Sequence, residues 1–287
     1  MVLESITTPE KAERRPWDML FIGAMYAAIA VFLAIWIFKE ESSMVTVLLT
    51  VIACIPLLYN TLKFEEEKDD LISKESILLK EHSRALSFFM FLFVGFVIAY
   101  SIAYIVLPTD LVEVLFSAQT TTIEKINGEL TGHNIVSLGE GIPLFIQILS
   151  NNLKVLLFCL FFSFFYGAGA IFVLTWNASV ISAAIGNFFR TNIVEVATSF
   201  GLTNVGSYFT VYSMSIIRYF IHGIPEIFGY YIGALAGGII SVAVIKHDFG
   251  STNFKHVLRD SLDLIIIGVA VLIFAAFVEV YITPLFF

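Results

Sequence analysis

Long apolar stretches alternate with short polar segments along the whole chain. The main stretches are Met19–Phe38, Met44–Leu62, Phe88–Leu107, Leu153–Leu174, Val180–Phe189, Tyr208–Ile245 and Leu262–Val280. Most of them approach the ~20 residues that an α-helix needs to cross the hydrocarbon core of a bilayer. The pattern predicts an all-α, polytopic membrane protein with about six to seven transmembrane helices. Val180–Phe189 is too short for a full crossing, and we expect an interfacial or re-entrant piece there.

The stretch Tyr208–Ile245 is too long for one ordinary crossing and contains glycine and proline near its middle. Gly223 ends a helix readily, and Pro225 followed by Glu226 is typical of a helix start. This sequence predicts two helical pieces that meet inside the bilayer. The segment would then be a broken or re-entrant one.

Four ionisable residues fall in or near these apolar stretches. Arg218, His222 and Glu226 recur at intervals of four, so they would share one helix face and could pair. Glu279 lies near the end of the last apolar stretch. Because an ionisable side chain at membrane depth costs about 2.5 to 3.5 kcal/mol on insertion scales, such residues need partners. We predict that the four form an intramembrane polar cluster, although a purely architectural use of the Pro-containing motif is an equal alternative.

Small residues mark two sites of close helix packing. Gly229, Gly233 and Gly237 form a stripe at four-residue spacing that lets another helix approach closely. The stripe suits either packing within the chain, which we favour, or a homo-oligomer. Gly167 and Gly169 form a second packing point.

The polar segments divide the chain into three parts. Residues 1–62 form an N-terminal tail and a transmembrane hairpin, and residues 88–287 form the membrane core. Between them, the acidic segment 63–87 reads as a cytoplasmic amphipathic helix with a solvated charged face. Residues 108–150 form an extracytoplasmic loop, and Asn151 and Asn152 would cap the helix that follows. Basic residues concentrate in the tail, in 63–84 and in 246–259, which predicts a cytoplasmic N-terminus.

Composition supports membrane insertion and excludes several other classes. Hydrophobic residues make up 58% of the chain and charged residues 14%, against ~25% charged in soluble domains. The net charge of −8 comes without a basic patch, which argues against nucleic-acid binding. Cys54 and Cys159 sit inside apolar runs, so we expect neither a disulfide nor a metal site. No nucleotide-binding, hydrolase or zinc motif occurs, and we expect no cofactor and no enzymatic activity.

Four short motifs, taken together, resemble a known family. They are Asn151-Asn152 before an apolar helix, the Gly167-x-Gly169 turn with Asn177 beyond it, the His222-Gly223-Ile224-Pro225-Glu226 sequence with its glycine stripe, and the ending Ala275-Ala276-x-x-Glu279-x-x-Ile282-Thr283-Pro284. In this order they resemble the stage II sporulation protein M family over roughly Lys74 to Phe287. The resemblance implies a multi-pass protein of a prokaryotic plasma membrane. In spore formers, family members anchor an envelope-remodelling complex with peptidoglycan-degrading partners and are not themselves regarded as enzymes.

Two classes of function follow from these observations. The first is a non-catalytic scaffold or anchor for envelope or membrane-remodelling partners, implied by the resemblance. The second is a small-solute or ion transporter, because charged residues at a helix break are typical of coupled transporters. An intramembrane lipid-processing enzyme is a third and weaker hypothesis.

Overall fold

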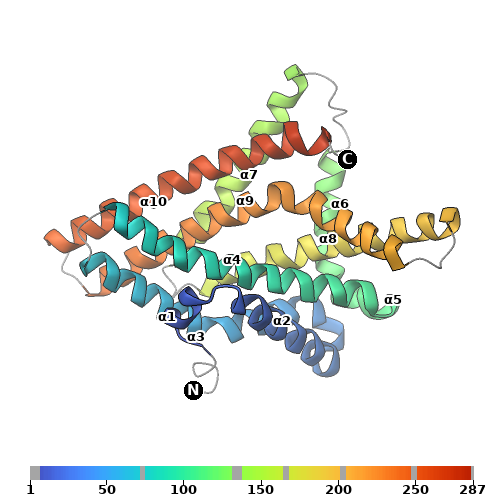
Figure 1. Ribbon diagram of the computed structural model, residues 1–287, viewed down its shortest axis with the longest axis horizontal. Coiled ribbons are helices and arrows are strands. Elements are labelled where there is room, and N and C mark those ends of the chain that lie inside the picture. Colours follow the sequence, from blue (N-terminus) through green and yellow to red (C-terminus); the bar gives the residue numbers. More distant parts are fainter. Residues whose placement is uncertain are drawn as a thin grey trace.

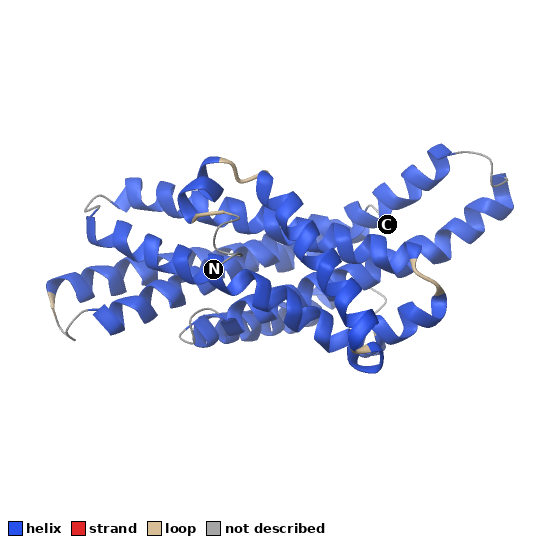
Figure 2. Ribbon diagram, turned by 90° about the horizontal axis from the view of Figure 1, so that it is seen from below, coloured by secondary structure: helices blue, strands red, loops and turns tan. Residues whose placement is uncertain are grey.

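The chain folds into a bundle of long helices (Figures 1 and 2). The computed structural model describes residues 7–71, 75–130, 138–163, 168–200, 205–246 and 251–285. The helices are α1 (Pro9–Arg14), α2 (Asp18–Ile37), η2 (Lys39–Glu41), α3 (Ser42–Leu71), α4 (Glu75–Val106), α5 (Thr109–Leu115), α6 (Ser117–Leu130), α7 (Leu138–Ser163), α8 (Ala168–Phe200), α9 (Val205–Lys246), α10 (Thr252–Phe277), η3 (Val278–Ile282) and η4 (Thr283–Leu285). This part of the chain contains no strand.

Seven helices in the described ranges are long and apolar enough to cross a membrane: α2, α3, α4, α7, α8, α9 and α10. They confirm the predicted all-α, polytopic fold. The fold follows from backbone chemistry, because a helix satisfies every amide and carbonyl within its own segment where lipid offers no hydrogen bonds.

The predicted break in the long apolar stretch was wrong. α9 runs without interruption from Val205 to Lys246, with Pro225 inside it. Proline removes one backbone hydrogen bond and its ring crowds the preceding turn, but a membrane helix can absorb both by bending against its neighbours. Figure 1 shows α9 changing direction along its length. The stretch therefore supplies one crossing, Val211–Val244, and not a re-entrant pair.

Two other predicted boundaries in the second half of the chain were also wrong. The expected helix Leu153–Leu174 is split between α7, which ends at Ser163, and α8, which begins at Ala168. Val180–Phe189 is an internal part of α8 and not a re-entrant piece. The apolar residues 142–149 join the start of α7, so α7 reaches a spanning length with a different set of residues.

α8 also continues beyond the apolar stretch Val180–Phe189 and ends at Phe200. Arg190 lies inside α8, and its guanidinium donates to the backbone carbonyls of Ile105, at 3.3 Å, and Leu107. These carbonyls belong to the end of α4 and the residue after it, where the helix leaves acceptors without intrahelical partners. Arg190 therefore satisfies the C-terminal end of α4 and fastens it to α8.

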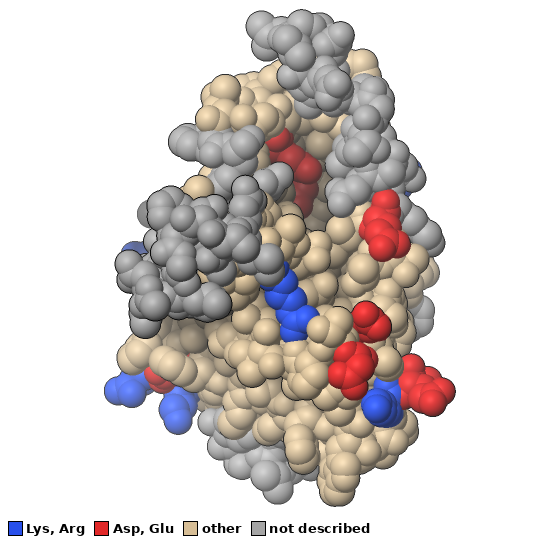
Figure 3. Space-filling model, turned by 90° about the vertical axis from the view of Figure 1, so that its right-hand side faces the viewer, with Lys and Arg blue, Asp and Glu red and all other residues tan. Residues whose placement is uncertain are grey.

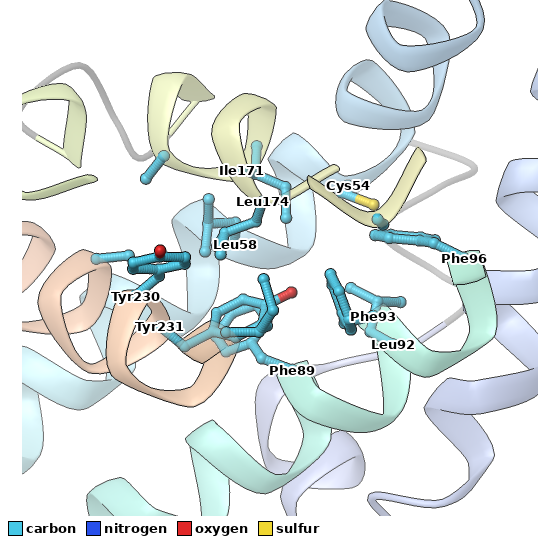
Figure 4. Packing of buried hydrophobic residues seen from close by; sticks show 14 of the residues in the cluster. Cys54, Leu58, Phe89, Leu92, Phe93, Phe96, Ile171, Leu174, Tyr230 and Tyr231 are labelled. Atoms are coloured by element: carbon cyan, nitrogen blue, oxygen red, sulfur yellow. The ribbon is translucent and has the colours of Figure 1, made fainter. Parts of the chain in front are cut away.

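The centre of the bundle is aromatic. Figure 4 shows Phe89 and Phe93 of α4, Leu58 of α3 and Tyr231 of α9 converging on one packed cluster. The rings of Phe89 and Tyr231 stack with centroids 5.4 Å apart. This cluster fixes α9 against α3 and α4, so the opposite face of α9 is free to pack on α7 and α10.

The glycine stripe of α9 is used within the chain. A Cβ atom at Gly229 would meet Leu272 of α10, and one at Gly237 would lie 2.6 Å from the backbone oxygen of Leu160 in α7. Gly233 faces Leu156 of α7 in the same way. The favoured interpretation, internal packing, is therefore confirmed, and this stripe is not available to a second copy of the chain.

Candidate functional site

A polar site lies where α7, α9 and the end of α10 meet, and Asn152 is at its centre. The Asn152 side-chain amide donates to Oε1 of Glu226, and its Oδ1 atom accepts from the Tyr230 hydroxyl at 2.9 Å. Asn152 and Tyr230 are 3% and 2% exposed. Glu226 and Tyr230 are one helical turn apart on α9, so a single side chain of α7 can reach both.

Glu279 brings a second carboxyl group to this site. It lies in the π-helical turn η3, directly after α10, and is half-buried like Glu226. The Glu226 and Glu279 side chains are close enough to repel each other when both are ionised. π-helical turns are rare in proteins overall. Those that do occur are often found at functional sites, because the extra residue turns side chains to new directions. Here the turn places an acidic residue among buried helices.

His222 lies one turn before Glu226 on α9 and faces the C-terminal end of the chain. Its Nδ1 atom is 3.4 Å from the Thr283 hydroxyl. Glu226 thus contacts Asn152 of α7, and His222 contacts Thr283 after η3. The Arg218 side chain lies outside the described residues.

Figure 3 shows the end of the molecule where α4 meets α5. Acidic side chains lie recessed on this face, a basic side chain lies near its middle, and other charged side chains lie toward its edge.

The other predicted site residues lie elsewhere. Asn151 is exposed on α7, and Asn152 is inside α7, so neither caps a helix as predicted. The Asn177 amide donates to the Val173 carbonyl of its own helix at 2.8 Å. Gly167 lies outside the described residues, and Gly169 is in the first turn of α8.

A second polar cluster, which the sequence did not reveal, joins α1, α3 and α4. Lys68 Nζ lies 2.7 and 2.9 Å from the two carboxyl oxygens of Glu13 and 2.7 Å from Oε1 of Glu65. His82 Nδ1 lies 2.6 Å from Oε2 of Glu65. We call Glu13, Glu65, Lys68 and His82 the N-terminal ion cluster.

The interpretation of segment 63–87 as a solvated charged face was wrong at the N-terminal ion cluster. Glu65 and Glu66 are fully buried, and His82 is 1% exposed. The described part of the segment is the C-terminal end of α3 and the N-terminal end of α4. These two ends lie together, so Glu65 and His82, 17 positions apart, make contact. The i,i+3 spacing of Glu65 and Lys68 was the visible signal, but it gave no indication of burial.

Metal binding by three or more residues has no basis in the described part of the chain. No group of three or more His, Cys, Asp or Glu side chains there could hold a metal ion. The Glu226 site offers two carboxyl groups and amide and hydroxyl groups. Such a set suits a proton or a weakly bound cation.

The fold defines a polytopic α-helical membrane protein, and Glu226 and Glu279 lie within two of its candidate spans. The chain belongs to the stage II sporulation protein M family, whose model matches residues 85–284. An uncharacterized protein of the archaeon Methanocaldococcus jannaschii is 28% identical over 166 residues, covering 56% of this chain and 82% of that protein. No solved structure matches the chain. The match begins in α4, so α1, α2 and the whole of α3 lie before the family region.

Proposed function

We propose that this protein is a transporter for a small solute or ion that uses Glu226 and Glu279 to bind protons. The observation that supports the proposal best is the meeting of two carboxyl groups from α9 and η3 with Asn152 of α7 inside the bundle. Glu226 lies near the middle of its candidate span, Val211–Val244. Ionisable residues at such depth usually mark ion or proton pathways.

Charge at the site would be coupled to helix position. With both carboxyl groups ionised, Glu226 and Glu279 repel each other in a poorly solvated environment, and a proton or cation between them removes the repulsion. Asn152 holds Glu226 on the α7 side, so movement of α7 relative to α10 would change the separation of the two acids. The bend of α9 around Pro225 gives the bundle a place to flex.

The proposed orientation places the N-terminus in the cytoplasm and the protein in the plasma membrane. Basic residues in the tail, 63–84 and 246–259 support this orientation. With seven crossings, the end of the bundle in Figure 3 would then face outward. The recessed acidic side chains of this face would then lie on the outer side, from which a proton-driven transporter takes up protons.

Proton flux through purified protein tests the proposal. In proteoliposomes that contain a pH-sensitive dye, we expect Glu226→Gln to reduce proton flux about 100-fold, within the range that a positioned proton-transfer group contributes. Glu113→Gln, an exposed acid on α5, is the matched control and should retain full flux. Equal flux in the wild type, Glu226→Gln and protein-free liposomes would contradict transport through this site.

A non-catalytic scaffold or anchor is the second candidate function, and family membership favours it. A scaffold that recruits envelope or membrane-remodelling partners needs no proton site, so Glu226→Gln should lower stability without a flux phenotype. Crosslinking in native membranes should then recover a defined partner protein. Absence of both flux and a reproducible crosslink would argue against both candidates.

A further inference from the structure

The N-terminal ion cluster ties the short helix α1 to the membrane bundle. α1 packs on α3 and α4 (Figure 1). Ala12 of α1 is buried, with only 2% of its surface exposed. Glu13 is the residue of α1 that joins the cluster, through Lys68. The Glu13 and Lys68 side chains are only 7% and 11% exposed, so this is a desolvated contact and not a surface ion pair.

The charges of the cluster do not balance without an added proton. With both carboxyl groups ionised and His82 neutral, Glu13, Glu65 and Lys68 carry one net negative charge in a buried environment. One proton on His82 or on a carboxyl group restores neutrality, and a buried uncompensated charge is costly.

The geometry points to a proton-binding site in the N-terminal ion cluster that controls whether α1 stays docked on α3 and α4. Protonation of the Glu13 and Glu65 pair keeps α1 docked, and loss of the proton releases it. The cluster is independent of the Glu226 site and of the proposed transport. The N-terminal ion cluster binds a proton, and the effect of that binding is whether α1 is docked or undocked.

Protons can reach the cluster from water. A cavity of about 650 Å³ borders Glu13 and Lys68. Its other charged walls are Glu10 and Arg14 from α1 and Glu81 and Arg84 from α4. Arg84 pairs with Glu81 at 2.7 Å, which in turn lies 3.9 Å from Lys68 Nζ. Glu81 and Arg84 therefore neutralise each other, so this pair does not supply the positive charge that the cluster lacks.

The titration of Glu13 gives the direction of the switch. Burial, together with the hydrogen bond to Glu65, raises the pKa of Glu13 from 4.5 to about 7, although Lys68 acts in the opposite direction. In undocked α1 the carboxyl group is exposed and returns to its ordinary pKa of 4.5. The docked state therefore holds a proton that the undocked state has lost at pH between 4.5 and about 7. Rising pH across this window favours undocking and has no further effect above it.

A buried cysteine on α1 tests the proposal directly. Ala12→Cys places a thiol under docked α1, where a maleimide reaches it only after undocking. The native Cys54 and Cys159 are buried and serve as the background, measured in the protein without Ala12→Cys. Labelling rates at each pH are divided by the rate for the same protein in denaturing detergent, which removes the effect of thiol ionisation.

We expect the normalised labelling rate to rise about tenfold between pH 6 and pH 8, as linkage requires for one proton and these two pKa values. Glu13→Gln in the Ala12→Cys protein mimics the protonated acid and keeps its amide near Lys68 and Glu65, so labelling should stay slow at both pH values. Glu40→Gln, an exposed acid on η2 that does not line this cavity, is the matched control and should keep the tenfold change.

Two results would overturn the proposal. One is a labelling rate that does not change with pH in the Ala12→Cys protein. The other is a full tenfold change in the presence of Glu13→Gln, which would assign the proton to another group. Labelling in the presence of Glu226→Gln should match that of the Ala12→Cys protein, so failure of the proposed transport and failure of this switch are separately visible.

Discussion

At the scale of single residues, Asn152 has the largest calculable effect on the candidate site. Its amide and carbonyl satisfy Glu226 and Tyr230 at once in a buried position. Asn152→Ala removes both contacts and leaves polar groups without these partners, which costs about 1 to 3 kcal/mol for each buried group. We expect a clear drop in the free energy of unfolding, measured by thermal melting in detergent micelles.

The chain offers its own control for this prediction. Asn151 is the neighbouring residue of the same type on the exposed side of α7, so Asn151→Ala should change stability by less than about 0.5 kcal/mol. Tyr230→Phe removes only the hydroxyl contact and should fall between the two. Equal losses for the two asparagine variants would mean that the polar contacts of Asn152 do not stabilise the fold.

At the scale of elements, the packing of α9 on α7 depends on close backbone approach. A methyl group at Gly237 would lie 2.6 Å from the Leu160 oxygen and 3.0 Å from the Ser163 Cβ atom. A backbone oxygen cannot move aside as a flexible side chain can, so Gly237→Ala should destabilise the protein by about 1 to 3 kcal/mol. Thermal melting of the purified variant measures this loss.

Gly223 provides the contrasting variant on the same helix. A methyl group there would meet only Ile181 Cδ1 at 3.7 Å, which is an ordinary contact. Alanine also favours the helix by up to about 1 kcal/mol over glycine. Gly223→Ala should therefore be neutral or stabilising. A loss as large as that of Gly237→Ala would show that flexibility near Pro225, and not packing, determines the cost.

At the scale of the whole molecule, the continuity of α9 decides the topology. Three crossings, α7, α8 and α9, separate α5 from the start of α10. Cysteines at Glu113 and Thr252, both exposed, should therefore react from opposite sides of the membrane. With a cytoplasmic N-terminus, an impermeant maleimide should label Glu113→Cys on intact cells and Thr252→Cys only after permeabilisation. Labelling of both from one side would support a re-entrant α9.

The outcome of the sequence interpretation differs between residue types. Glu226 and Glu279 were identifiable because an acidic residue inside an apolar stretch is conspicuous whatever its neighbours. Asn152 was noticed for the wrong role, since a cap and a buried hydrogen-bonding partner have the same letter. Glu65 and His82 were assigned to solvent, because a charged run looks the same whether or not another helix covers it.

The sequence by itself determined that the chain is a bundle of membrane-spanning helices, because apolar stretches of this length in lipid can satisfy their backbone groups only as helices. It also singled out the packing stripe Gly229, Gly233 and Gly237, but not Gly23 and Gly95, which allow α2 and α4 to approach closely. Tertiary structure alone decided that α9 continues through Pro225, since neighbouring helices compensate a lost hydrogen bond that local sequence counts as a break. It also decided the partners of Glu226 and Glu65, because contacts between residues 74 and 17 positions apart depend on which helices become neighbours.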